Sequence, residues 1–441
     1  MSRRNAKATR SKERDTRDIE RVRRVGEITE YLLPGNGLRV LYARRPGTGV
    51  VTSNILYFVG SRDEAHGETG VAHMLEHMLF KPTTHDRSAK SEAAAMRFER
   101  EFGIVLNANT WKDRTTYYFS YPKAHLERAL SIEAERMRDV IMDEAEFAPE
   151  RTNVLSEYDM YAGDEQFALA VDMTAAAFQS HPYGHETIGF REDIESYTPQ
   201  MLRRFYERFY VPGNAVLIIV GDLIEREMKE AVLRYFKDVP PGPVPERLEV
   251  KEPKQRGRRL VEVRRESKTN VYAIGVKHGP FPTKPWYETM AVFDMLAGGR
   301  DSILHKALVD TGLVTRIDTS VEPSRSENLA ILFFTLSPKA SHDAVRKRML
   351  ASLASLNKKT ITPYLQKTIA KAVTSEFETR ENSLGYVAEL VEYVSAGQWT
   401  AFFETERMLR SIRPDDVLTR VRDLFVEENT TEGRFIGTKR T

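Results

Sequence analysis

The sequence of 441 residues contains no cysteine, and only 10 of its residues are histidine. The absence of cysteine excludes disulfide bonds and thiolate metal ligands. A metal ion in this protein would therefore need histidine, aspartate or glutamate side chains as its ligands. Because histidine is scarce, two histidines close together in the chain are informative.

A long apolar segment is also missing. No run in the sequence approaches the ~18 consecutive apolar residues that a membrane-spanning helix needs, so we expect no membrane span. Hydrophobic residues make up 41% of the chain and charged residues 29%, a balance typical of globular proteins. The chain is too long for one ordinary core, so we expect at least two domains.

Basic residues are concentrated at the N-terminus, where residues 1–24 carry ten Arg or Lys and four Asp or Glu. The acidic residues interrupt the basic run and no aromatic residue accompanies it, so we expect no nucleic-acid binding. The segment lacks the apolar core of a secretory signal, which favours a cytoplasmic over a periplasmic location. We expect residues 1–28 to be a basic, disordered tail.

Proline marks the clearest boundary in the chain, with four prolines in the seven residues 239–245. Such a segment cannot be a helix or a central strand. Similar patterns of strands and helices precede it and follow it. We therefore expect two similar domains of roughly 200 residues each, at 29–238 and 258–441, joined by a linker at 239–257.

The hydrophobic periodicity predicts the individual elements. In the first half we expect a hairpin at 30–42 with an Asn36-Gly37 turn, strands at 50–60, 105–110, 115–121 and 215–221, and helices at 68–80, 89–102, 124–143 and 147–162, with a further helix ending at Tyr235. In the second half we expect strands at 259–264, 270–276 and 328–336, and helices at 285–296, 342–356, 363–380 and 384–396.

The most informative segment lies in the predicted helix at 68–80. His73 and His77, four residues apart, lie on one face of a helix and can share a metal ion, and Glu76 projects from nearly the same stripe. The order His-x-x-Glu-His is a known signature of zinc peptidases. A solvated helix face is the alternative. The surrounding residues are apolar nearly all round, however, and buried imidazoles need a partner such as a metal.

A catalytic zinc site needs a third protein ligand and an open position. The predicted helix at 147–162 offers two candidates, Glu150 and Glu157, which lie two turns apart on one face. One carboxylate could bind the metal while the other holds a ligand histidine in place. The spacing alone does not decide between these roles, and two surface glutamates are the simpler alternative.

In these two segments the chain resembles the M16 family of zinc metallopeptidases, which includes pitrilysin, insulysin and mitochondrial processing peptidase. The resemblance covers most of residues 30–430 and is strongest over Gly67–Lys81. It implies an α+β fold of two similar domains, each a mainly antiparallel sheet packed against helices, which together form half of a clamshell. It also implies that one Zn²⁺ binds to His73, His77 and Glu157, that Glu76 is the general base, and that Glu150 is the supporting carboxylate.

Further segments are similar to landmarks of the family, among them His181-Pro182-Tyr183-Gly184. The resemblance implies that an edge strand beside the zinc binds an extended peptide through backbone hydrogen bonds. The residues expected to bind substrate in this way are Leu106, Asn107, Ala108, Asn109 and Thr110. When the second half is aligned with the first, Asp294 occupies the position of His77. We therefore expect a metal site in the first half alone.

One departure from the family concerns the second half, where self-sufficient members carry an Arg and, seven residues later, a Tyr that reach the bound peptide. The corresponding positions here hold Leu308 and Thr315, although Arg316 is adjacent and Arg300 is near. The sequence therefore predicts a zinc-dependent endopeptidase subunit that acts on peptides or unfolded chains as a heterodimer with a related chain that supplies Arg and Tyr. A self-sufficient homodimer and a non-catalytic structural subunit are the alternatives.

Overall fold

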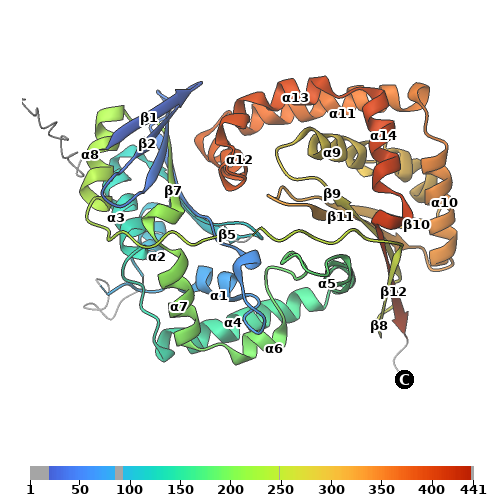
Figure 1. The fold of residues 1–441 in the computed structure, drawn as a ribbon, viewed down its shortest axis with the longest axis horizontal. Helices are drawn as coiled ribbons and strands as arrows, with labels where there is room; N and C mark the ends of the chain where they lie inside the picture. Colours follow the sequence, from blue (N-terminus) through green and yellow to red (C-terminus); the bar gives the residue numbers. More distant parts are fainter. Residues whose placement is uncertain (1–18, 85–92, 248, 439–441) are drawn as a thin grey trace, which may run out of the picture.

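The protein is described by a computed structural model over residues 19–84, 93–247 and 249–438 (Figure 1). It is an α+β structure with two sheets, one in each half of the chain, and helices packed against both. Within these residues, no helix is both long and apolar enough to cross a membrane.

The sheet of the first half has seven strands in the order β1-β2-β3-β7-β4-β6-β5. Neighbouring strands are antiparallel, except for the parallel pair β3 and β7. Strand β7 is apolar along its whole length and buried on both faces, which suits its central position. The strands are β1 (Glu20–Val25), β2 (Ile28–Leu32), β3 (Arg39–Arg44), β4 (Val50–Tyr57), β5 (Val105–Thr110), β6 (Thr115–Pro122) and β7 (Ala215–Gly221).

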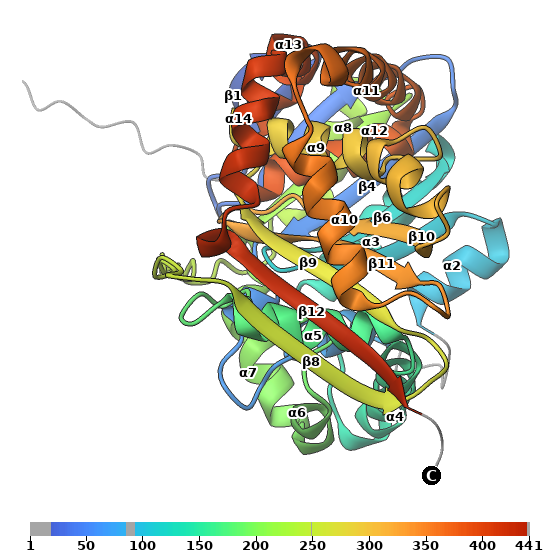
Figure 2. The ribbon, with the colours of Figure 1, turned by 90° about the vertical axis from the view of Figure 1, so that its right-hand side faces the viewer.

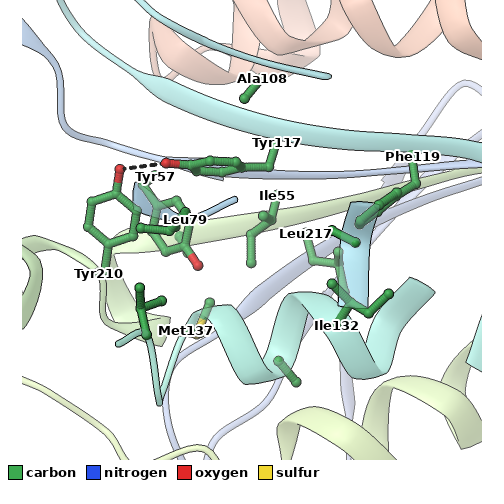
Figure 3. Packing of buried hydrophobic residues seen from close by; sticks show 14 of the residues in the cluster. Ile55, Tyr57, Leu79, Ala108, Tyr117, Phe119, Ile132, Met137, Tyr210 and Leu217 are labelled. Carbon is green, nitrogen blue, oxygen red and sulfur yellow. Dashed lines mark hydrogen bonds between the residues drawn. The ribbon is translucent and has the colours of Figure 1, made fainter. Parts of the chain in front are cut away.

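Helices of the first half cover one face of this sheet and form the first apolar core with it. In Figure 3, Ile55, Tyr117 and Leu217 of the sheet lie opposite Leu79 and the residues of a neighbouring helix. The hydroxyl groups of Tyr117 and Tyr210 are 3.1 Å apart within this core, so each buried phenol has a partner. The helices are α1 (Val71–Met78), α2 (Ala94–Phe102), α3 (Leu126–Arg136), α4 (Glu144–Ala162), α5 (Glu165–Ala177), α6 (Arg191–Ser196), α7 (Pro199–Phe209) and α8 (Glu225–Phe236).

The sheet of the second half has five strands in the order β10-β11-β9-β12-β8, with β12 and β8 parallel and the other pairs antiparallel. Its strands are β8 (Arg259–Glu266), β9 (Val271–His278), β10 (Val314–Ser320), β11 (Asn328–Leu336) and β12 (Thr430–Thr438). Its helices are α9 (Lys284–Ala297), α10 (His342–Ala354), α11 (Lys358–Thr379), α12 (Ser383–Ser395), α13 (Thr405–Ser411) and α14 (Pro414–Leu424).

The two halves exchange helices. Helix α12 of the second half packs on strands β4 and β7, so Leu56 and Ile218 belong to the same core as Tyr386 and Leu390. Helix α5 of the first half packs on the second sheet, where Leu169 and its neighbours contact strands β8 and β12. Figure 2 shows α5 lying behind these two strands. Each sheet is therefore covered on one face by a helix from the other half of the chain.

Two sequence-based expectations differ from the structure. The prediction of a disordered tail at 1–28 is wrong for residues 20–25, which form strand β1 and pair with β2. The strand was not predicted because most of its side chains are charged and exposed, so it has no apolar pattern. Arg23 pairs with Glu30 of β2 at 2.6 Å. Charged residues are common on the edge strands of sheets. Residues 1–18 lie outside the described part of the chain.

The helix expected to begin at Pro363 begins at Lys358 instead, so this proline lies inside α11. The side chain of Asn357 accepts a hydrogen bond from the backbone N–H of Thr360, which gives the earlier start its N-terminal cap. The helix expected at 124–143 is also shorter and ends at Arg136. Of the helix expected at 89–102, residues 89–92 lie outside the described residues.

Candidate metal centre

Helix α1 carries the three residues of the histidine motif. Its apolar side chains are fully buried in the first core, which leaves His73 and His77 together on the one face that is partly open. The helix begins after Gly70, whose φ of 87° is left-handed. A Cβ on Gly70 would lie 2.2 Å from the carbonyl oxygen of Ile188, so a larger residue would displace the start of the helix.

The structure brings His73, His77 and Glu157 together. The Nε2 atoms of His73 and His77 lie 3.8 and 3.5 Å from Oε2 of Glu157. Two donors on a tetrahedral zinc ion, each at ~2.1 Å, would be about 3.4 Å apart, which is close to these two distances. The three ligand atoms all lie within 4.8 Å of one another. Within the described part of the chain, this is the one group of three His, Asp or Glu residues that could hold a metal.

Glu150 lies on the other side of His77. Its Oε2 is 3.3 Å from Nδ1 of His77, and its Oε1 pairs with Lys81. The hydrogen bond from His77, together with Lys81, lowers the pKa of Glu150 to about 2. Since Nδ1 of His77 faces this carboxylate, its Nε2 is directed at Glu157. Glu157 thus lies near both histidines and Glu150 near His77. Their roles as zinc ligand and supporting carboxylate stay predictions.

Protonation of the two histidines differs. Burial, together with the nearby His77, lowers the pKa of His73 to about 4, although Glu157 raises it. Burial also opposes charge on His77, but hydrogen bonds to Glu150 and Glu157 outweigh it and raise the pKa of His77 to about 9. At neutral pH and without a metal, His77 would therefore carry protons on both ring nitrogens. A metal ion that binds its Nε2 atom would have to displace one of them.

Glu76 is nearly buried, with 9% of its surface exposed, and lies beside this group. Burial raises the pKa of Glu76, while a hydrogen bond from Thr110 lowers it. The Thr110 hydroxyl donates to Oε2 of Glu76 at 2.6 Å. The side chain of Thr110, expected to be part of a substrate strand, thus holds the carboxylate expected to be the base. Sequence spacing could not reveal this contact, since 34 residues separate the two.

Strand β5 forms the open edge of the first sheet, because it pairs with β6 alone among the described strands. Leu106, Ala108 and Thr110 face inward, and Asn107 and Asn109 are exposed. The strand packs beside α1. A cavity of 410 Å³ opens between them, and its walls are made by His77, Phe80, Lys81, Met96, Glu99, Leu106, Asn107 and Glu150. An extended chain paired with β5 would therefore pass the candidate metal site.

Arg114 is a further residue at this site that the sequence analysis missed. It is 4% exposed and donates hydrogen bonds to Asn109 of β5 and to Glu392 of α12. Its positive charge also lowers the pKa of Glu76. The contact ties the substrate-strand region to the second half of the chain. The sequence could not predict the contact between Arg114 and Glu392, because 278 residues separate them.

A second missed residue is Glu64, whose side chain is fully buried before the start of α1. Its two carboxylate oxygens accept hydrogen bonds from the backbone N–H groups of Gly70 and Ala72 at 2.7 and 2.9 Å. The Nε2 atom of His185 is 2.9 Å from the same carboxylate. Glu64 therefore fixes the N-terminus of the helix that carries the histidine motif.

Replacing Glu64 with Gln should lower the free energy of unfolding by about 1–3 kcal/mol, because a buried amide group would face backbone N–H donors. Urea unfolding measures this. Glu68→Gln is the control, since Glu68 is only partly buried and its ion-pair partner Arg204, 3.3 Å away, is largely exposed. The control should change stability by less than ~0.5 kcal/mol. Equal stability of the two variants would contradict the role of Glu64.

The second half shows no comparable site among its described residues. Asp294, at the position matching His77, binds Thr368 and Lys371 at 2.7 Å each. Leu308 is fully buried in the core, and Thr315 is exposed on β10. Arg316 pairs with Asp318 of the same strand at 2.6 Å, and Arg300 is exposed. Neither Leu308 nor Thr315 can donate as Arg and Tyr would.

Two family models match the chain. The model described as insulinase, peptidase family M16, matches residues 39–190, and the model described as peptidase M16 inactive domain matches residues 196–371. The chain belongs to peptidase family M16. The first model covers all of His73, Glu76, His77 and Glu157, and the second begins in α6 and reaches α11.

Relatives of this M16 chain are named as zinc proteases. It is 28% identical over 404 residues to the zinc protease PqqE of Helicobacter pylori, covering 90% of each chain. It is 32% identical over 298 residues to the uncharacterized zinc protease Rv2782c of Mycobacterium tuberculosis, covering 66% of this chain and 63% of that one. The crystal structure of a protease from Helicobacter pylori superposes with a TM-score of 0.84 at 26% identity, covering 91% and 97%.

Proposed function

We propose that this M16 chain is a zinc-dependent endopeptidase that hydrolyses peptides or unfolded polypeptides. The observation that carries the proposal is the convergence of His73, His77 and Glu157 beside the buried carboxylate of Glu76. Two imidazole nitrogens and one carboxylate oxygen are a ligand set of catalytic zinc, and they leave its fourth position open. The names of the relatives support the same reaction.

In the proposed mechanism, His73, His77 and Glu157 would hold Zn²⁺, which would supply Lewis acidity at this site. Glu76 takes the proton from the attacking water and later delivers it to the leaving amine. Burial raises the pKa of this carboxyl group, which suits a group that must hold a proton during the reaction. Thr110 keeps the carboxylate in position. The open edge of β5 aligns the peptide by backbone hydrogen bonds.

We further propose that the chain works as the zinc-bearing subunit of a heterodimer that encloses the peptide in a chamber. Buried Leu308 and exposed Thr315 leave the second half without the Arg and Tyr donors of self-sufficient family members. A related chain would supply them. The periplasmic protease PqqL of Escherichia coli supports such pairing at the level of the fold, because this chain matches 48% of its length with a TM-score of 0.74.

The test is an assay of the purified zinc-loaded chain against a library of quenched peptides, alone and with its M16 paralogue. We expect weak or no hydrolysis by the chain alone and turnover after the paralogue is added. A chelator should abolish this activity and stoichiometric zinc should restore it. Full activity of the chain alone would contradict the heterodimer and favour a self-sufficient homodimer. No hydrolysis in either arm, despite bound zinc, would favour a structural subunit.

A further inference from the structure

A second cavity, of 1080 Å³, lies where the linker meets both halves of the chain. Figure 1 shows the linker crossing between the halves. Each of the three parts contributes an arginine to the wall: Arg62 from the segment before α1, Arg247 from the linker and Arg325 from the connection between β10 and β11. None of the residues of the candidate metal centre lines this cavity.

Two buried donor groups at this cavity have no partner among the described residues. His181 is 6% exposed and lines the cavity, and its Nε2 forms no hydrogen bond. Its Nδ1 accepts a hydrogen bond from the backbone N–H of Tyr183 at 3.3 Å, so the ring proton is on Nε2. Nη1 of Arg247 is also buried without a partner, while its Nη2 donates to the carbonyl of Phe58. Unpaired buried donors are rare and indicate a missing acceptor.

The charges around these donors favour an anion. Burial is the main cause that lowers the pKa of Arg247 to about 10. The nearby Asp63 raises this pKa, whereas the positive charges of Arg325 and Arg62 lower it. Asp113 is already engaged, because it pairs with Arg62 at 3.0 Å and accepts the hydroxyl of Tyr183. The charged residues that line the cavity include more basic than acidic side chains. The basic ones are Arg62, Arg247, Lys251, Lys254, Lys277, Arg325 and Arg420, and the acidic ones are Glu249, Glu252, Glu327, Asp423 and Glu428.

Other features of the wall narrow the ligand class. Glu252 is satisfied by the backbone N–H groups of Gln179, Ser180 and His181, and it lies 3.5 Å from Lys277. Further acidic residues, among them Glu249 and Glu327, also line the cavity, so a long polyanion would be repelled. No Phe, Tyr or Trp lines it within the described residues, which removes a stacking surface for a nucleotide base.

We propose that this cavity binds a small phosphate-type anion, such as phosphate or pyrophosphate, between His181, Arg247 and Arg325. The guanidinium groups match the oxygen atoms of such an anion, and hydrogen bonds between charged partners are the strong ones. The bound anion would connect the first half, the linker and the second half. This site is independent of the proposed peptidase activity, because it shares no residue with the metal centre.

The test is isothermal titration calorimetry of the full-length chain with phosphate, pyrophosphate, triphosphate and ATP at constant ionic strength, with and without bound zinc. We expect saturable binding in both zinc states, with pyrophosphate at least tenfold tighter than phosphate. ATP should bind no tighter than inorganic triphosphate. Binding that requires zinc, or no saturable binding at all, would overturn the proposal. Tighter binding of ATP would overturn the restriction to small anions.

Variants assign the binding to this cavity. Arg247→Gln and Arg325→Gln should each weaken pyrophosphate binding at least tenfold and leave the zinc content unchanged. The control is Arg226→Gln, because Arg226 is exposed on α8 and pairs only with Glu230 within the described residues. Circular dichroism would check that each variant is folded. Unchanged binding in the folded double variant, or an equal loss in the control, would contradict the assignment.

Discussion

Replacing Glu76 with Gln should lower kcat by roughly 10²–10⁴-fold and leave one zinc ion bound per chain. The amide has the size of the carboxylate, and its oxygen can still accept the hydrogen bond that Thr110 donates at 2.6 Å. The amide cannot accept a proton from water, however. The variant should therefore lose the general base and keep the contact with Thr110. The measurement is kcat on a quenched peptide, together with zinc content by elemental analysis.

The matched control for this variant is Glu101→Gln. Glu101 is exposed on α2, does not line the cavity of 410 Å³ beside the metal centre and is not one of the three clustered ligands. It should keep kcat within a few-fold of the unchanged chain. A Glu76→Gln variant with full kcat would exclude Glu76 as the general base. Loss of zinc from that variant would instead point to a structural role for its charge.

The second large effect concerns the metal itself. Replacing Glu157 with Gln should weaken zinc binding by more than 100-fold and abolish turnover, because it removes the negative charge and one of three protein ligands. Replacing Glu150 should have a smaller effect of about 10–100-fold, the usual consequence of losing a partner that orients a ligand histidine. Competition with a chromophoric chelator measures both zinc affinities.

The series separates the two glutamates of α4. Both lie on one helix and both contact His77, Glu157 through Nε2 and Glu150 through Nδ1. Glu144→Gln is the control, since Glu144 is exposed at the start of the same helix and should leave zinc affinity unchanged. An equal loss in the Glu150 and Glu157 variants would contradict the division between a ligand and a supporting group.

Local patterns were enough to predict much of this molecule. The four-residue spacing of His73 and His77 sets their common helix face, and the apolar run at 215–221 is the central strand β7. The M16 membership expected from the motif is confirmed by the family models. These features depend on neighbours in sequence, where helical and strand periodicities act directly.

Features that depend on distant contacts were not predictable in this way. Glu64 holds the start of α1, but nothing in its neighbourhood distinguishes it from a surface glutamate. Arg114 reaches Glu392 across the two halves of the chain. Strand β1 lies in the segment predicted to be a disordered tail, because its charged side chains give no sign of the pairing with β2. In each case, tertiary structure decides what the local sequence leaves open.

The exchange of helices between the halves has a consequence for how a substrate would enter. Separating the two halves would strip α12 from β4 and β7, and α5 from β8 and β12, and would expose apolar faces of both sheets to water. We therefore expect the two halves to move together as one rigid body. The proposed chamber would then open by movement of this whole chain relative to a second chain, and not by a hinge within this one.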